Sequence, residues 1–210
     1  KLATTNDGSC FYDSDGDGIV DSLEVVGCQD SLACDYNINA TESGECSYSQ
    51  EGYDCDGNIT AQIGDVIEGG YLFYLDETGE RGLVAAMEDL EGTYEWGCSG
   101  TEFSGAEGTA IGTGYQNTLD IVSGCSETPI PASEALAYES EGYSDWYLPS
   151  KDELIEMYNT IGNGGPDGNI GGFSNDNYWY WSSSEWGNNL DAAWSVTFNN
   201  GLPGFNHKFN

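Results

Sequence analysis

The sequence predicts an α+β domain preceded by a small, cysteine-rich N-terminal segment. Five of the seven cysteines lie within the first 55 residues, whereas strand and helix patterns are concentrated after residue 65. At 210 residues, the chain is long enough for one domain of ordinary size and a smaller unit. We predict four segments: a loop and the end of a preceding repeat (1–27), a cysteine-rich repeat (28–58), a linker (59–64) and the α+β domain (65–210).

The charge of the chain limits its partners. Lys and Arg total 4 against 37 Asp and Glu, which gives a formal net charge of -33. Nucleic acid and other polyanions are therefore excluded as expected partners, because they are bound largely through Lys and Arg. The cysteines favour an oxidising compartment, so we expect a secreted or cell-surface protein, with a virion surface as an alternative. No apolar run approaches the roughly 20 residues that cross a bilayer, so no membrane insertion is expected.

Residues 13–24 match the loop template of an EF-hand at its ligand positions. Carboxylates alternate with small residues, and Gly18 stands where the loop must turn sharply. Because Ca²⁺ takes six to eight hard oxygen ligands, this pattern predicts a calcium site. An ordinary acidic surface loop is the alternative. The expected ligands are Asp13, Asp15, Asp17, the carbonyl of Ile19, Asp21 and Glu24.

The sequence leaves no room for a helix before this loop, because Cys10 lies three residues ahead of Asp13. The segment therefore resembles the helix-poor calcium loops of dockerins and thrombospondin type 3 repeats, and this resemblance implies a stiffening role. A weaker candidate follows at Asp35, Asn37, Asn39 and Glu42, where a network of Asx turns without metal is an equal alternative.

Residues 7–12 are echoed by residues 43–48, which indicates a repeating unit. Residues 27–58 resemble a short cysteine repeat found in tandem in large secreted proteins of marine Bacteroidetes, and this resemblance implies a spacer. Five cysteines cannot all pair within the segment, whereas Cys98 and Cys125 can pair in the larger domain. We expect the remaining thiol to be Cys10, paired upstream of residue 1 or free. The connectivity of the other four stays open.

The larger domain carries signals for two helices and several short strands. Ser150 and Glu153 form a capping box ahead of an apolar helical pattern that Gly162 ends. A proline near the first turn marks the other helix. The predicted elements are a hairpin (69–75 and 83–86), helices at 131–138 and from 151 to about 161, and strands at 178–183 and 193–198 with a turn at 199–201.

Several motifs in this domain resemble the Lcl C-terminal domain family, whose members are C-type-lectin-like domains at the tips of bacterial adhesins and phage proteins. The motifs are residues 96–98, 110–114, 144–154, 180–185 and 193–198. The resemblance implies a C-type-lectin-like fold. The Glu-Pro-Asn and Trp-Asn-Asp signatures of calcium-dependent lectins are absent from the sequence, so a calcium-bridged monosaccharide is not expected.

Aromatic and amide side chains alternate with glycine near the C-terminus, a mixture that binding surfaces use for stacking and adaptable hydrogen bonds. A polar edge that binds nothing is the alternative. Trp146, Trp181 and Trp194 are expected in the core instead. The candidate ligand-binding residues are Trp186, Asn188, Asn189, Asp191, Leu202, Phe205, Asn206, His207 and Phe209.

These observations favour an extracellular adhesion or receptor-binding module whose partner is a cell-surface glycan or protein receptor. The second hypothesis is a structural subunit of a cell-surface or virion filament, which would associate with itself. An enzyme is not expected, because His207 is the single histidine and no nucleophile, base and orienting group assemble around it. A glycosidase, which needs only two carboxylates, stays open as a distant alternative.

Overall fold

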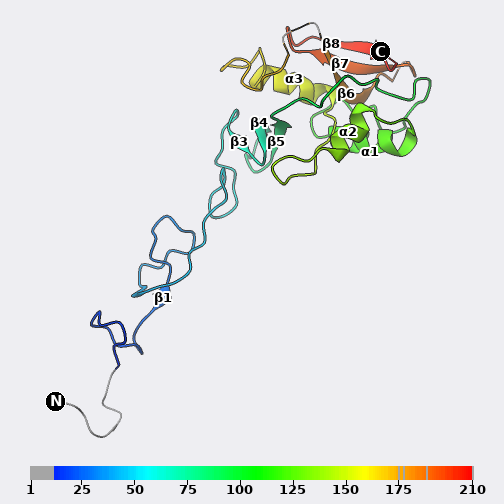
Figure 1. Cartoon of the computed structure of the whole chain (residues 1–210). Coiled ribbons are helices and arrows are strands. Elements are labelled where there is room, and N and C mark those ends of the chain that lie inside the picture. Colours follow the sequence, from blue (N-terminus) through cyan, green and yellow to red (C-terminus); the bar gives the residue numbers. More distant parts are fainter. Residues whose placement is uncertain (1–11, 175, 177, 188, 210) are drawn as a thin grey trace, which may run out of the picture. The chain divides into compact units, whose positions relative to one another are not determined.

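The computed structural model describes residues 12–174, 176, 178–187 and 189–209. The chain divides into two compact units, and the division falls between Thr60 and Ala61. We call them the N-terminal unit and the C-terminal unit and treat each on its own (Figure 1). No helix in the described part of the chain combines the length and apolar character that a membrane span requires.

The N-terminal unit is held by cross-links and turns. Its regular structure is a short parallel pair, β1 (Val26–Gly27) and β2 (Glu42–Ser43). Two disulfides, Cys28–Cys46 and Cys34–Cys55, close loops around this pair. Cys10 lies outside the described residues. Among the described side chains of this unit, the buried apolar ones are Cys28 and Ala33, so apolar packing contributes little to it.

The C-terminal unit begins with a three-stranded antiparallel sheet in the order β3 (Val66–Ile67), β4 (Gly70–Leu75) and β5 (Gly82–Ala86). The predicted hairpin is confirmed as β4 and β5. Its turn is closed by the amide of Asp76, which donates to the carbonyl of Arg81 at 2.9 Å.

Both predicted helices are confirmed, but the expected number of two was wrong because the structure contains a third helix. The structure contains α1 (Gly114–Gly124), α2 (Pro131–Ala137) and α3 (Lys151–Thr160). The capping box of α3 is present: the Ser150 amide donates to Glu153 at 2.7 Å, and the Glu153 amide donates to the Ser150 hydroxyl at 3.3 Å. Helix α1 escaped prediction because it buries Asn117 and Thr118, so its buried face is not an apolar stripe.

A second antiparallel sheet follows in the order β6 (Trp179–Glu185), β7 (Ala192–Thr197) and β8 (Pro203–His207). The two strands predicted in this region are confirmed as β6 and β7. Strand β8 lies at an edge of the sheet, where the missing amide of Pro203 is tolerated.

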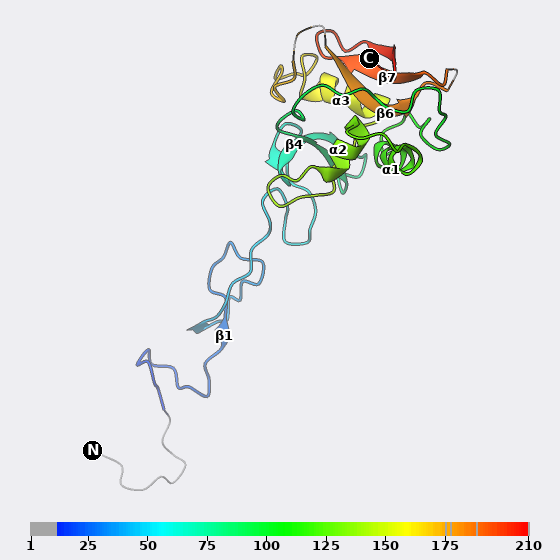
Figure 2. The ribbon, with the colours of Figure 1, turned by 45° about the vertical axis from the view of Figure 1, so that its right-hand side comes forward.

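Two buried clusters form the core of the C-terminal unit. One is built around Trp96, Phe103 and Ile121, and the other around Phe73, Ile161 and Phe198. Helix α3 contacts β4, β6 and β7, so it joins the two sheets, as Figures 1 and 2 show. A disulfide links Cys98 to Cys125 beside the first cluster. The class observed for the described residues is therefore α+β, with three disulfides and three small sheets among them.

Candidate metal loop and binding surface

The acidic loop of the N-terminal unit folds its first three aspartates toward one another. Oxygens of Asp13, Asp15 and Asp17 lie within 4.8 Å of each other. Backbone amides hold them there: Gly16 donates to Asp13 at 2.7 Å, and Ile19 donates to Asp17 at 2.7 Å. The turn needs glycine, because Gly16 and Gly18 have φ of 85° and 98°.

Asp21 braces the loop from its far end. The amide and hydroxyl of Ser14 donate to its two carboxylate oxygens at 2.8 and 2.7 Å. These hydrogen bonds lower the pKa of Asp21 below its ordinary value. The backbone closes in the same place, since the Asp21 amide donates to the Tyr12 carbonyl at 2.8 Å.

A second carboxylate group joins the loop to the cysteine-rich repeat. Oxygens of Asp15, Glu24 and Glu42 also lie within 4.8 Å of one another. Glu42 arrives there because β2 pairs with β1 in the register Val26 with Glu42, and the Glu42 amide donates to the Val25 carbonyl at 3.1 Å. The Cys28–Cys46 disulfide holds the same two strands together.

Crowding of these carboxylates alters their titration. Loss of hydration, followed by repulsion from Glu42, raises the pKa of Glu24 above its ordinary value. Repulsion from Asp15 is the largest cause of the raised pKa of Glu42. Residues 12–60 contain no Lys, Arg or His that could offset the charge. The arrangement therefore favours a bound cation.

The donor set fits Ca²⁺. Calcium binds carboxylate and carbonyl oxygens at about 2.3–2.6 Å, so two of its ligand atoms lie up to about 5 Å apart. The two clusters of three carboxylates have Asp15 in common, and the oxygens within each cluster meet that spacing. Glu42 extends the set expected from the sequence. Only the β1–β2 register reveals its position, and parallel pairing of two-residue strands leaves no periodic signal in the sequence.

The residues of the weaker calcium-site candidate, which runs from Asp35 to Glu42, make separate contacts in the structure. Asp35 accepts a hydrogen bond from the Ser47 amide at 2.9 Å, and the Asn37 side chain accepts one from the Asn39 amide at 3.0 Å. The Asn37 contact is that of an Asx turn, whereas the Asp35 contact joins two segments 12 residues apart. Glu42, the fourth member, lies with the first loop instead.

The candidate ligand-binding residues of the C-terminal unit include two aromatic stacks. The Trp186 and Phe205 rings stack with centroids 3.7 Å apart. The His207 and Phe209 rings stack at 5.2 Å. We call these four side chains the tip surface. Phe205 is 52 % exposed and Phe209 is 55 % exposed, so both stacks present apolar area to solvent.

A buried ion pair fixes the backbone within the second stack, between His207 and Phe209. Lys208 and Glu185 form a salt bridge, and both side chains are almost completely buried. The Lys208 ammonium also donates to the Thr101 carbonyl at 2.7 Å and lies 4.6 Å from the Trp96 ring centroid. Because Lys208 is held inward, its neighbours His207 and Phe209 face solvent.

The other predicted ligand residues have structural contacts or lie apart. Asp191 accepts from the Ser99 hydroxyl at 2.9 Å, and Asn189 accepts from the Asp191 amide at 3.0 Å within the β6–β7 turn. Asn206 donates to Ser195 at 2.9 Å on the opposite face of β8 from Phe205. Leu202 is exposed beyond the other end of β8. Asn188 lies outside the described residues.

Sequence reasoning missed two neighbours of the tip surface. Trp194, expected in the core, is partly exposed and lies edge-to-face with Trp186 at 6.3 Å. The Lys151 ammonium lies 5.1 Å from the Trp194 ring centroid. Trp146 and Trp181 are partly exposed as well, although Trp181 packs against the first core cluster as expected. An aromatic residue in a strand carries no sequence signal for the face that is left open, so this could not be predicted.

Comparison with known families supports the resemblance that the sequence motifs indicated. The family model of the Lcl C-terminal domain matches residues 86–210, which is more than half of the chain. No curated protein matches the sequence. The chain therefore belongs to the Lcl C-terminal domain family.

Proposed function

We propose that this chain is an extracellular adhesion or receptor-binding module in which a C-type-lectin-like domain binds a cell-surface glycan or protein receptor. Family membership indicates an adhesin-like extracellular module, and the three disulfides agree with an oxidising compartment. The tip surface is the observation that carries the binding role. Exposed aromatic side chains that gather in one place mark interaction sites more often than catalytic ones.

The proposal includes no enzymatic activity. His207, the single histidine of the chain, is exposed and stacks on Phe209. A stacked imidazole on an exposed strand offers contact area, whereas a general base needs a partner that orients it toward a reacting group. We therefore assign His207 to recognition.

The N-terminal unit acts in this proposal as a spacer stiffened by calcium. Asp13, Asp15, Asp17, Glu24 and the Ile19 carbonyl would hold the ion, with Asp21 bracing the loop and Glu42 joining from β2. A divalent cation at this position would neutralise the mutual repulsion of the carboxylates. Because Glu42 belongs to the cysteine-rich repeat, the ion would also tie the acidic loop to the disulfide-linked part.

The binding role can be tested with labelled protein on glycan arrays and in cell-surface pull-downs, both with calcium present. The variant Phe205→Ala/Phe209→Ala is expected to lose most binding, because it removes the exposed phenyl ring of each stack. Val66→Ala is the matched control, since Val66 is a similarly exposed apolar residue on β3 of the same unit. Loss of folding in the double variant, seen by near-UV circular dichroism, would return both residues to a structural role.

A structural subunit of a cell-surface or virion filament is the second candidate function. It is favoured by the position of β8, which pairs with β7 at the edge of its sheet and carries exposed Phe205. An edge strand of this kind can pair with a neighbouring copy. Concentration-dependent self-association in sedimentation experiments, together with failure to bind any glycan or cell surface, would favour the filament.

A further inference from the structure

A large cavity opens in the C-terminal unit away from the tip-surface stacks. Its volume is about 710 Å³, which is within the range of ligand-binding sites. Its floor consists of buried side chains from both core clusters, including Leu148, Leu154 and Phe173. Residues 88–90 and 92–94, which follow β5, and the beginning of β6 form part of its walls. We call this cavity the aromatic groove.

The walls of the groove are rich in aromatic rings, and two of its indole N–H groups are already hydrogen-bonded. The Trp181 indole donates to the Tyr94 carbonyl at 3.0 Å, and the Trp146 indole donates to the Tyr143 carbonyl at 3.1 Å. Trp179 is 44 % exposed at the mouth. The Trp181 and Trp146 indoles therefore offer ring surface to a ligand rather than free N–H donors.

The groove reaches β8 from the face opposite Phe205. Trp179 lies over Gly204, where an added Cβ would stand only 2.6 Å from the indole ring. Asn206, two residues further along β8 and therefore on the same face as Gly204, lines the groove, whereas Phe205 points to the other face of the strand. The groove and the tip surface are therefore separate surfaces that share one strand.

The charged groups of the groove are acidic. Glu88 and Asp89 line it, and none of the described lining residues is Lys, Arg or His. The Tyr180 hydroxyl donates to Asp89 at 2.8 Å and fixes that carboxylate at the wall. Burial raises the pKa of Tyr180 to about 12, so the hydroxyl stays a donor at neutral pH.

This chemistry selects a cation with an apolar stem. An anionic ligand would meet two carboxylates and a chain of net charge -33. A neutral sugar would leave the negative charge of the two carboxylates without a counter-charge. An ammonium group satisfies the carboxylates and is attracted to ring faces, while its methylene stem packs on aromatic carbon.

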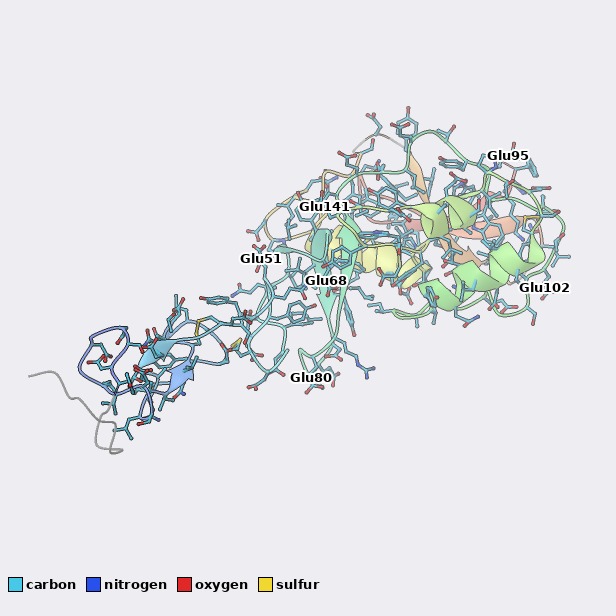
Figure 3. The ribbon with its side chains drawn as sticks, turned by 60° about the horizontal axis from the view of Figure 1, so that its bottom comes forward. Glu51, Glu68, Glu80, Glu95, Glu102 and Glu141 are labelled. Atoms are coloured by element: carbon cyan, nitrogen blue, oxygen red, sulfur yellow. A yellow bond between two sulfur atoms is a disulfide. The ribbon has the colours of Figure 1, made fainter. Side chains whose placement is uncertain are left out.

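We propose that the aromatic groove binds a lysine-bearing, apolar segment of a protein partner. The ammonium group would lie near Glu88 and Asp89, and the stem would pack against Trp179 and Trp181. The inference rests on the proposed receptor-binding function and narrows it to a protein receptor with a basic surface. Charge complementarity supports this occupant, because the acidic side chains of the C-terminal unit attract cations to the unit. Such side chains project from separate parts of the unit in Figure 3, which labels Glu68, Glu80, Glu95, Glu102 and Glu141.

The test uses the full chain and defined probes in isothermal titration calorimetry at physiological ionic strength. The first probe is a short peptide of alternating lysine and leucine. The second is the same peptide with every lysine acetylated, and the third is the hexylammonium ion. We expect the lysine peptide to bind and acetylation to weaken it by about tenfold, because the charge is lost while the stem is kept.

Two matched variants locate the binding. Glu88→Gln/Asp89→Asn removes the groove charges and should weaken the lysine peptide by about tenfold, while the amide oxygen at position 89 still accepts from Tyr180. Glu102→Gln/Glu141→Gln removes the same charge from exposed residues outside the groove and should leave affinity unchanged. Near-UV circular dichroism checks that both variants stay folded.

Three outcomes would overturn the inference. The acetylated peptide could bind as tightly as the lysine peptide, or both double variants could weaken the lysine peptide equally. Alternatively, hexylammonium could bind while the lysine peptide does not. The first would show apolar recognition, the second an effect of net charge, and the third a small-molecule site. Cell-surface binding that depends on Phe205 and Phe209 would still stand in each case, so failure of the groove is distinguishable from failure of the receptor-binding function.

Discussion

The two units of this chain solve the problem of stability in different ways. The C-terminal unit buries two apolar clusters, whereas the described part of the N-terminal unit buries only Cys28 and Ala33 among its apolar residues. Two disulfides across 18 and 21 residues take the place of a core there. A small segment with so little apolar burial depends on cross-links and ligands, so its stability should respond to solution conditions that leave the C-terminal unit unchanged.

The same contrast holds for charge. In the C-terminal unit, the buried carboxylate of Glu185 is neutralised by Lys208 and accepts a second hydrogen bond from the Phe103 amide at 2.8 Å. In the N-terminal unit, Asp15, Glu24 and Glu42 crowd together, and residues 12–60 supply no basic side chain. One unit carries its counter-charge in its own sequence, whereas we propose that the other takes it from solution as a bound cation.

The largest expected effect concerns the internal counter-charge. Lys208→Met leaves Glu185 buried without its partner, which should destabilise the C-terminal unit by about 3–5 kcal/mol. For a unit of about 150 residues, this lowers Tm by roughly 10 °C. All six tryptophans lie in this unit, so a thermal melt followed by tryptophan fluorescence reports on it alone.

Lys151→Met is the matched control for this variant. Lys151 pairs with Asp152 at 3.0 Å, but both side chains are partly exposed, so its removal should cost at most about 1 kcal/mol. Equal melting temperatures for the two variants would contradict the view that Lys208 neutralises a desolvated carboxylate.

The next effect concerns the external counter-charge. Chelation should lower the melting temperature of the N-terminal unit, because a ligand at 100 times its Kd stabilises the folded state by about 2.7 kcal/mol. Amides that donate to loop carboxylates, such as those of Gly16 and Ile19, should exchange hydrogen faster in EDTA. The tryptophan melt of the C-terminal unit serves as the internal control. Unchanged exchange and melting over residues 12–30 would refute the calcium proposal.

The part of the fold that follows local rules was predictable from the sequence. Helix α3 is marked by its capping box, and β4 and β5 are marked by their turn and apolar runs. Helix α1 was not predictable, because Asn117 and Thr118 are buried through hydrogen bonds to Gly108 and Gly114 rather than through apolar contacts. Burial that is satisfied by hydrogen bonding leaves no hydrophobic period to detect.

The candidate sites show the same limit. The spacing of Asp13, Asp15 and Asp17 is local, so the sequence places them in one loop. Glu42 is brought to them by a strand register 18 residues after Glu24, which no local pattern encodes. The aromatic groove combines residues 84–94 with residues 131–181 and Asn206, and such a long-range assembly follows only from the tertiary fold.

The smallest expected effect is that of Glu42→Gln on hydrogen exchange, which should slow without calcium and speed up with calcium. Because the pKa of Glu42 and that of Glu24 are raised in the folded state, the folded apo unit binds protons more tightly than the unfolded chain. Their contribution to stability is therefore full below the ordinary carboxyl pKa of 4.5 and is lost as pH rises through the raised values. At pH 7 without calcium, Glu42→Gln removes the carboxylate repulsion and should slow hydrogen exchange of two amides near it. The Thr41 amide donates to the Val25 carbonyl, and the Gly44 amide donates to the Gly27 carbonyl.

The benefit of Glu42→Gln should disappear at acid pH, where Glu42 of the wild type is itself neutral. In calcium at pH 7 the same two amides should exchange faster in the variant than in wild type, since the variant lacks one of the proposed carboxylate ligands of the ion. Glu45→Gln changes the net charge equally three residues away and is expected to alter neither state. A change of the same sign in EDTA and in calcium would mean that Glu42 only adds repulsion, and the ion would then depend on the residue 13–24 loop alone.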